Sequence, residues 1–93
     1  MFVSVVVESG SLESAESINS ILNESGFNKI QKSCWECINI DEKRLSILKK
    51  NIDNVTDYYD KVRMYQFPVN GSFVITELKQ KKWRRAVFNS KKS

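Results

Sequence analysis

The sequence contains no histidine, one proline and only three glycines among its 93 residues. Without histidine the chain cannot build a Ser-His-Asp or Cys-His nucleophilic site, and it lacks the side chain most often used as a general base. The three glycines form neither a GxGxxG motif nor a phosphate-binding P-loop. Any catalysis would therefore depend on carboxylates, lysine, tyrosine, cysteine or a metal ion bound by oxygen ligands.

Cysteine is scarce as well, because Cys34 and Cys37 in the stretch CWEC are the only two. A structural zinc ion needs about four ligands, and the sequence offers no second pair of thiols and no imidazole. A thioredoxin-like pair opens a helix, whereas residues that favour β-strands surround this one. We therefore expect two reduced, structural cysteines within a strand.

Long apolar runs are absent too. No segment approaches the roughly 18 apolar residues that a membrane-spanning helix requires. The first ten residues carry neither the basic segment nor the cleavage site of a signal peptide. We expect a cytoplasmic protein that makes no contact with a membrane.

What the sequence does contain is an uneven distribution of charge. The net charge is +4, yet residues 77–93 hold seven basic residues and one acid, so the rest of the chain is slightly acidic. Such asymmetry favours contact with phosphates or with an acidic protein surface. We expect residues 79–93 to form a basic C-terminal tail, whose candidate nucleic-acid-binding residues are Lys79, Lys81, Lys82, Arg84 and Arg85.

The hydrophobic pattern predicts an α+β domain over residues 1–78. Apolar residues at helical spacing follow plausible N-caps at Ser11 and Asp41, and β-branched or alternating segments lie between these helices. A turn near Lys32 and Ser33 would divide the long segment 27–40 into two short strands. The predicted elements are strand 2–7, helix 12–25, two strands within 27–40, helix 42–52, strand 61–67 and strand 72–78.

The order β-α-β-β-α-β followed by one more strand is the ferredoxin-like arrangement with an extra C-terminal strand. An exposed sheet edge invites pairing, so exchange of the extra strand within a homodimer would satisfy it. The predicted core residues are Val3, Val5, Val7, Ile18, Leu22, Ile30, Leu45, Leu48, Val62 and Met64.

Four stretches together resemble the CRISPR-associated protein two family, the small subunit of the spacer-acquisition complex. The opening MFVSVVVES is similar to that family's first strand, which ends in an acid, and FVITEL lies where the family has its exchanged last strand. The segment from Gly26 to Glu36 matches a pattern with Gln31, Ser33 and an aromatic residue, and DKVRMYQF matches a D-x-V-R-x-Y strand.

The resemblance implies a homodimer that lies between two dimers of the CRISPR integrase subunit and contacts the DNA backbone. It also implies a possible metal-dependent endonuclease, in which an acid at the end of the first strand binds Mg²⁺ from each protomer. Glu8 stands at that position, where the family has Asp. Because Glu is one methylene longer and Mg²⁺ requires near-ideal octahedral geometry, we expect nuclease activity to be weak or absent. As an alternative, Glu8 is a solvated acid near a helix N-terminus.

The roles of Arg63 and of the tail stay open at this point. Arg63 alternates with Val62 and Met64, so it faces away from the core, toward solvent, a dimer partner or a phosphate. Trp83 and Phe88 interrupt the cations of the tail, and a merely solvated basic tail needs no aromatic residues. The tail is expected to contact DNA phosphates, the integrase subunit through Trp83 and Phe88, or its own dimer.

Three functions follow from these observations. The first is an adaptor of spacer acquisition that spaces integrase dimers and contacts DNA without reading its sequence. The second is a Mg²⁺-dependent endonuclease on RNA or duplex DNA that uses Glu8 from both protomers as the catalytic metal ligand. The third is a toxin-like ribonuclease of the same fold, related to the virulence-associated protein D family.

Overall fold

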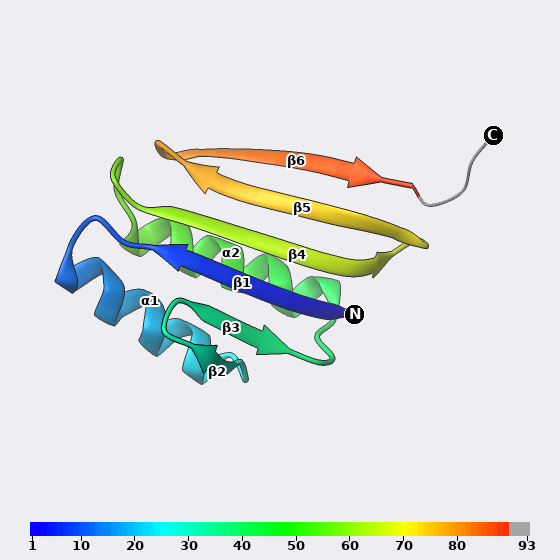
Figure 1. The fold of residues 1–93 in the computed structure, drawn as a ribbon, viewed down its shortest axis with the longest axis horizontal. Helices are drawn as coiled ribbons and strands as arrows, with labels where there is room; N and C mark the ends of the chain where they lie inside the picture. Colours follow the sequence, from blue (N-terminus) through cyan, green and yellow to red (C-terminus); the bar gives the residue numbers. More distant parts are fainter. Residues whose placement is uncertain (90–93) are drawn as a thin grey trace.

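The chain folds into one six-stranded antiparallel sheet with two helices on one of its faces (Figure 1). This computed structural model describes residues 1–89, and the strand order is β2-β3-β1-β4-β5-β6. The elements are β1 (Phe2–Glu8), α1 (Leu12–Glu24), β2 (Asn28–Gln31), β3 (Cys34–Cys37), α2 (Glu42–Val55), β4 (Lys61–Val69), β5 (Ser72–Lys79) and β6 (Lys82–Phe88). The first four strands and both helices are compatible with the ferredoxin-like arrangement expected from the sequence.

Both helices begin at the predicted caps. The Ser11 side chain accepts a hydrogen bond from the Ser14 N–H at 3.1 Å, and Asp41 accepts one from Arg44 at 2.7 Å. Gly26 follows α1 with φ of +88°, the left-handed conformation in which helices commonly end. Helix α2 continues to Val55, three residues beyond the predicted end, because the polar residues after Ile52 occupy its exposed side instead of starting a loop.

The two faces of the sheet differ in burial. Alternate side chains of β1 and β4, among them Val3, Val5, Val62 and Met64, pack under the helices and are fully buried. The predicted core is therefore confirmed except at Ile30, which is 52% exposed. The prediction for Ile30 was wrong because β2 is a short edge strand with an irregular register between Lys29 and Gln31, and all four of its residues are exposed.

The C-terminal part of the sheet is longer than expected. Residues 82–88, assigned from the sequence to a basic tail, form strand β6, which pairs with β5 from Phe73↔Phe88 to Lys79↔Lys82. The extra strand β5 pairs with β4 of the same chain. The structure thus places β5 within its own sheet, and its exchange with a second chain stays a proposal. Residues 90–93 of the expected tail lie outside the described part of the chain.

Two tight hairpins produce this arrangement. Asn70 and Gly71 have φ of 51° and 80°, the positive values that a two-residue hairpin turn of the type I′ kind requires. The strand before this turn includes Pro68 and Val69, two residues beyond the predicted end of strand 61–67. The second hairpin turns at Gln80 and Lys81, with φ of 54° and 59°. As a result β4, β5 and β6 form a continuous antiparallel meander that extends beyond the helices (Figure 1).

Candidate nucleic-acid and partner interfaces

Glu8, the predicted metal ligand, is the last residue of β1 and is exposed to solvent. Its neighbour across the strand pair is Lys61, and it lines a pocket of about 350 Å³ together with Lys29 and Lys32. A residue on the edge of this pocket, Trp35, is buried with an indole N–H that has no acceptor among the described residues. The other charged residues at this strand end and in this pocket, Lys29, Lys32 and Lys61, are therefore all cations.

These surroundings do not make a magnesium site within one chain. Mg²⁺ is usually bound by one or two carboxylates and several waters in near-octahedral geometry. Over residues 1–89, no group of three or more acidic, cysteine or histidine residues could hold a metal ion, so Glu8 would be a single carboxylate beside Lys61. One protomer alone does not fit the metal that the endonuclease hypothesis requires.

The loop after Glu8 is fixed by Asp60, a fully buried residue that the sequence had placed in a motif but not in a site. Its carboxylate accepts hydrogen bonds from the N–H of Gly10 at 2.7 Å and from the N–H of Asp57 at 2.8 Å. Burial alone would raise the pKa of Asp60, but hydrogen bonds from Gly10, Asp57 and Ser14 bring the pKa below its usual value. Asp60 thus joins the β1–α1 loop to the α2–β4 loop as an ionised group.

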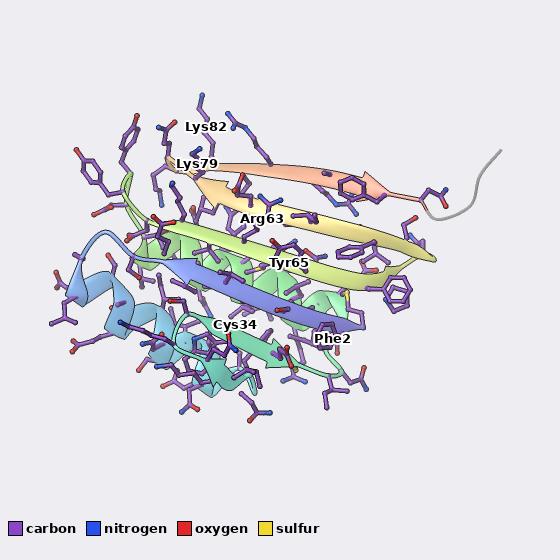
Figure 2. The ribbon with its side chains drawn as sticks, in the orientation of Figure 1. Phe2, Cys34, Arg63, Tyr65, Lys79 and Lys82 are labelled. Carbon is purple, nitrogen blue, oxygen red and sulfur yellow. The ribbon has the colours of Figure 1, made fainter. Side chains whose placement is uncertain are left out.

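Arg63 lies on the sheet face that no helix covers (Figure 2). Its Nε donates to the Tyr65 hydroxyl at 2.9 Å, and its Nη1 donates to the Glu77 carboxylate at 3.1 Å. The guanidinium also lies 5.5 Å from the centre of the Tyr65 ring. The prediction that Arg63 faces away from the core is confirmed, and two neighbouring side chains already engage its guanidinium.

The same uncovered face has an aromatic end, which we call the aromatic patch: Phe2, Tyr65, Phe67, Phe73 and Phe88. Phe73 is at its centre, with its ring 6.3 to 6.4 Å from the rings of Tyr65, Phe67 and Phe88 in edge-to-face geometry. The first four residues also line a hollow whose surface is apolar. Phe67, Phe73 and Phe88 are 50%, 40% and 53% exposed, so large rings face solvent in the single chain. Phe88, predicted to bind a partner, belongs to this patch.

The predicted cations of the C-terminal segment separate onto two faces. Lys79 and Lys82 are paired across the β5–β6 hairpin and lie close together at one end of the sheet (Figure 2). Arg84 is opposite Glu77, on the uncovered face, whereas Trp83 and Arg85 alternate with it and lie on the helix side. The sequence could not reveal this division, because it predicted no strand there.

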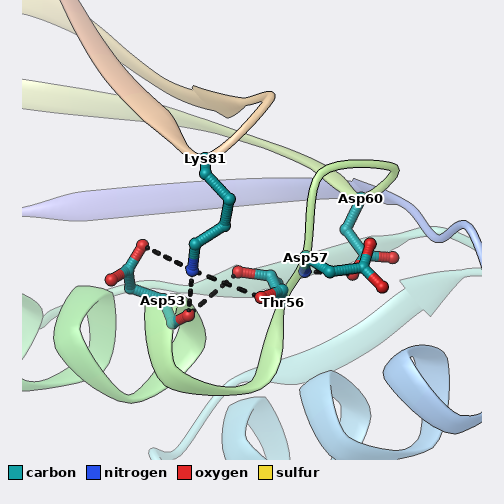
Figure 3. A network of polar contacts seen from close by, with 5 residues as sticks. All are labelled: Asp53, Thr56, Asp57, Asp60 and Lys81. Carbon is teal, nitrogen blue, oxygen red and sulfur yellow. Dashed lines mark hydrogen bonds and ion pairs between the residues drawn. The ribbon is translucent and has the colours of Figure 1, made fainter.

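Lys81 is engaged in structural contacts. Its ammonium group donates to the carbonyl oxygens of Asp53 and Thr56 at 2.6 and 3.2 Å and to the Asp53 carboxylate at 3.2 Å (Figure 3). These acceptors lie at the C-terminal end of α2, where a positive charge is favourable. Lys81 therefore attaches the β5–β6 hairpin to the helix layer, while its role as a phosphate ligand stays a prediction.

A groove on the helix side of β6 contains functional candidates that the sequence did not single out. It has a volume of about 470 Å³ and lies between α2 and the β5–β6 strands, with Trp83 partly buried in its wall. Lys49 and Lys50 line it from α2, opposite Arg85. Burial, followed by the positive charge of Arg85, lowers the pKa of Lys49. Within residues 1–89, none of these three cations forms an ion pair.

Among the described residues, neither helix has the length and apolar character needed to span a membrane.

Comparison with known proteins gives one family. The model of the CRISPR associated protein Cas2 family matches residues 13–75, which include β2, β3, α2, β4 and the first part of β5. No curated protein and no solved structure matches the chain. Glu8 and β6 lie outside the matched segment. Since the matched residues make up more than half of the chain, the protein belongs to the CRISPR associated protein Cas2 family.

Proposed function

We propose that the protein is a homodimeric adaptor of CRISPR spacer acquisition, which spaces integrase dimers and binds the DNA backbone. Family membership supports a CRISPR-associated role. The observation that carries the adaptor proposal is the uncovered sheet face with its aromatic patch. Exposed clusters of large apolar side chains mark interaction surfaces in soluble proteins. A second copy of the same face is a self-complementary partner, as two-fold symmetry requires.

Strand exchange is part of the same proposal. The ladder between β4 and β5 runs from Lys61↔Lys79 to Val69↔Ser72, so a partner's β5 could take the same place with the same hydrogen bonds. The Asn70–Gly71 turn is where the chain would open for such an exchange. Because β5 is the one strand that pairs with β6 within residues 1–89, the two strands would move as one hairpin.

The cations support a backbone contact that ignores base sequence. Lys79, Lys82 and Arg84 lie along the exposed β5–β6 region, and contacts from such cations to phosphates position a protein on DNA without reading its sequence. Neutralising phosphates in this way releases counterions, so DNA binding should weaken steeply with salt.

The adaptor proposal is tested with the purified protein, a CRISPR integrase subunit from the same source, and duplex DNA. Light scattering should show a complex that contains a dimer of this chain, and the complex should insert DNA into a CRISPR repeat only when both proteins are present. If the integrase subunit acts equally well alone and forms no complex, the proposal fails.

The endonuclease remains the second candidate, supported by the exposed position of Glu8 at the mouth of a pocket. The variant Glu8→Ala separates the two functions. An adaptor would retain complex formation and DNA insertion in this variant. Cleavage of RNA or duplex DNA that depends on Mg²⁺ and disappears in Glu8→Ala would favour the nuclease. Cleavage of RNA without any integrase complex would instead favour the toxin-like ribonuclease.

A further inference from the structure

The groove between α2 and β6 differs in chemistry from the uncovered face of the sheet. The cations that line it are Lys49 and Lys50 from the helix and Arg84 and Arg85 from the strand, whereas its acid, Asp53, is already paired with Lys81. On the uncovered face, by contrast, the Arg63 guanidinium is neutralised by Glu77. The groove therefore carries positive charge that no described side chain compensates with an ion pair.

The position of the groove follows from the shape of the fold. The two helices lie behind the first four strands of the sheet, and β5 and β6 extend past α2 without a helix on that side (Figure 1). Thr76, whose hydroxyl is bonded to Gln66 at 2.7 Å, contributes to the lining as a buried residue, and Trp83 presents a partly exposed indole. The result is an open, partly apolar groove with cations from the two elements that flank it.

This combination identifies the chemistry of the ligand. Lys49, Lys50 and Arg85 lie close together without a described ion pair, although the charge of Glu42 also acts on Lys49. A phosphate in the groove would form favourable charge-assisted hydrogen bonds with these cations. An aromatic ring beside a cationic groove is the arrangement that binds single-stranded nucleic acid, with phosphates on the cations and a base against the ring. A duplex keeps its bases paired and stacked and so cannot place a base against Trp83, whereas a single strand can.

We propose that the groove between α2 and β6 binds a single-stranded segment of DNA, with Lys49 and Arg85 as phosphate ligands and Trp83 as a stacking surface. The assignment of DNA instead of RNA rests on the proposed adaptor function, while the site itself rests on the groove. This site is separate from the aromatic patch and from Glu8, and it adds Lys49 and Lys50 to the candidate nucleic-acid-binding residues.

The test is a salt titration with a fluorescent oligothymidylate and with a duplex of equal charge. The groove variant Lys49→Gln/Arg85→Gln should bind the oligothymidylate on the order of tenfold more weakly at physiological salt. The slope of log affinity against log salt should fall by about 1.4, because each phosphate contact on a single strand contributes about 0.7. Duplex binding should change much less.

A matched control removes the same charge elsewhere. Lys32→Gln/Lys43→Gln also deletes two positive charges, from the exposed β2–β3 turn and the first turn of α2. It should keep most of the affinity for the oligothymidylate. Trp83→Leu, which retains an apolar side chain but removes the ring, should lower single-strand affinity about 5- to 100-fold. Thermal melting of each variant verifies that the fold is intact.

The outcomes separate this proposal from the adaptor function. Equal losses in the groove and control variants, or no loss in either, would overturn the groove assignment. Tighter binding of oligouridylate would overturn the choice of DNA, and displacement of DNA by polyglutamate at lower concentration would identify an acidic protein segment instead. Should the integrase complex fail to form while the groove variant still loses single-strand binding, the groove stands and the adaptor proposal falls.

Discussion

The buried carboxylate of Asp60 fixes the backbone of the loop that follows Glu8. It holds the backbone of Gly10 on one side and that of Asp57 on the other, and Glu8 lies just two residues before Gly10. Because buried hydrogen bonds to a charged group are worth more than neutral ones, this residue matters for the geometry of the loop as well as for stability.

Replacing Asp60 by Asn should lower the free energy of unfolding by about 2 kcal/mol or more at neutral pH, because an amide cannot accept from both N–H groups as a carboxylate does. Urea denaturation measures this. The exposed Glu24→Gln on α1 serves as the control and should change little. A value for Asp60→Asn equal to the control would contradict the role of the carboxylate.

Asp60→Asn also tests how the free energy of unfolding depends on pH. The pKa of Asp60 is lower in the folded state than in the unfolded chain, where an aspartate has a pKa of about 4. Ionised Asp60 therefore stabilises the fold fully at pH values above about 4. This contribution should be lost as the pH falls below about 4 toward the lower folded pKa. The stability of Asp60→Asn should lack this part of the acid dependence, whereas an identical pH profile in both proteins would show that Asp60 does not titrate as described.

Gly10 is needed for a different reason. A Cβ atom at this position would lie 2.6 Å from the Tyr59 Cβ and 3.0 Å from the Tyr59 carbonyl oxygen, so one of the two loops would have to move. Gly10→Ala should therefore cost about 1 to 3 kcal/mol in unfolding free energy, as overpacking typically does. Ala15→Ser on α1 adds an atom at a partly exposed position and should be tolerated. Thermal melting compares the two variants, and equal melting temperatures would show that the loops adjust freely.

Among the elements, the β5–β6 hairpin depends on its attachment to α2. Lys81→Met removes three acceptor contacts at the end of the helix and should lower stability by about 1 kcal/mol, since the lysine side chain is partly exposed. Lys82→Met, one residue further along, removes the same charge without a described ion pair and should change stability less. Chemical denaturation of both variants measures the difference. Similar values would mean that the three contacts contribute nothing beyond surface charge.

The elements that the sequence predicted are those with a local signal. Ser11 and Asp41 indicated where both helices begin and Gly26 where α1 ends, and the alternation in 61–67 indicated which side of β4 is buried. Strand β6 has no comparable signal, because its exposed residues include cations on each face and its hairpin turns at Gln80 and Lys81. Those residue types do not indicate the positive φ values that the turn adopts.

Less of the candidate sites could be predicted, because their residues come together through strand pairing and not through a local sequence signal. The cations of the C-terminal segment are evident in the sequence, but their division between two faces depends on the strand register. Lys49 and Lys50 look like solvated helix residues until β6 is placed opposite them. The clustering of Phe2, Phe73 and Phe88 likewise brings together β1 and the β5–β6 hairpin, which are distant in the chain.

For the molecule as a whole, the uncovered face of the sheet predicts a dimer. One charged side chain introduced into the aromatic patch should disrupt this dimer. Phe73→Glu places a carboxylate at the centre of the aromatic patch, where burial against a second copy would cost more than about 2 kcal/mol of association energy. Light scattering should then report a monomer. Ile47→Glu, at an exposed position on α2, should remain dimeric. A Phe73→Glu protein that stays dimeric would place the interface elsewhere.

The free edge of β6 has a consequence for handling the protein. An edge strand exposes unpaired backbone groups that can recruit other strands, and charged side chains are a common protection against this. Here that protection is Lys82, Arg84 and Arg85, on a strand whose remaining residues include Trp83, Val87 and Phe88. A bound polyanion would neutralise these three cations, whose mutual repulsion keeps the β6 edges of two molecules from pairing. The protein is therefore expected to be least soluble near charge balance with its nucleic acid and to redissolve when either component is in excess.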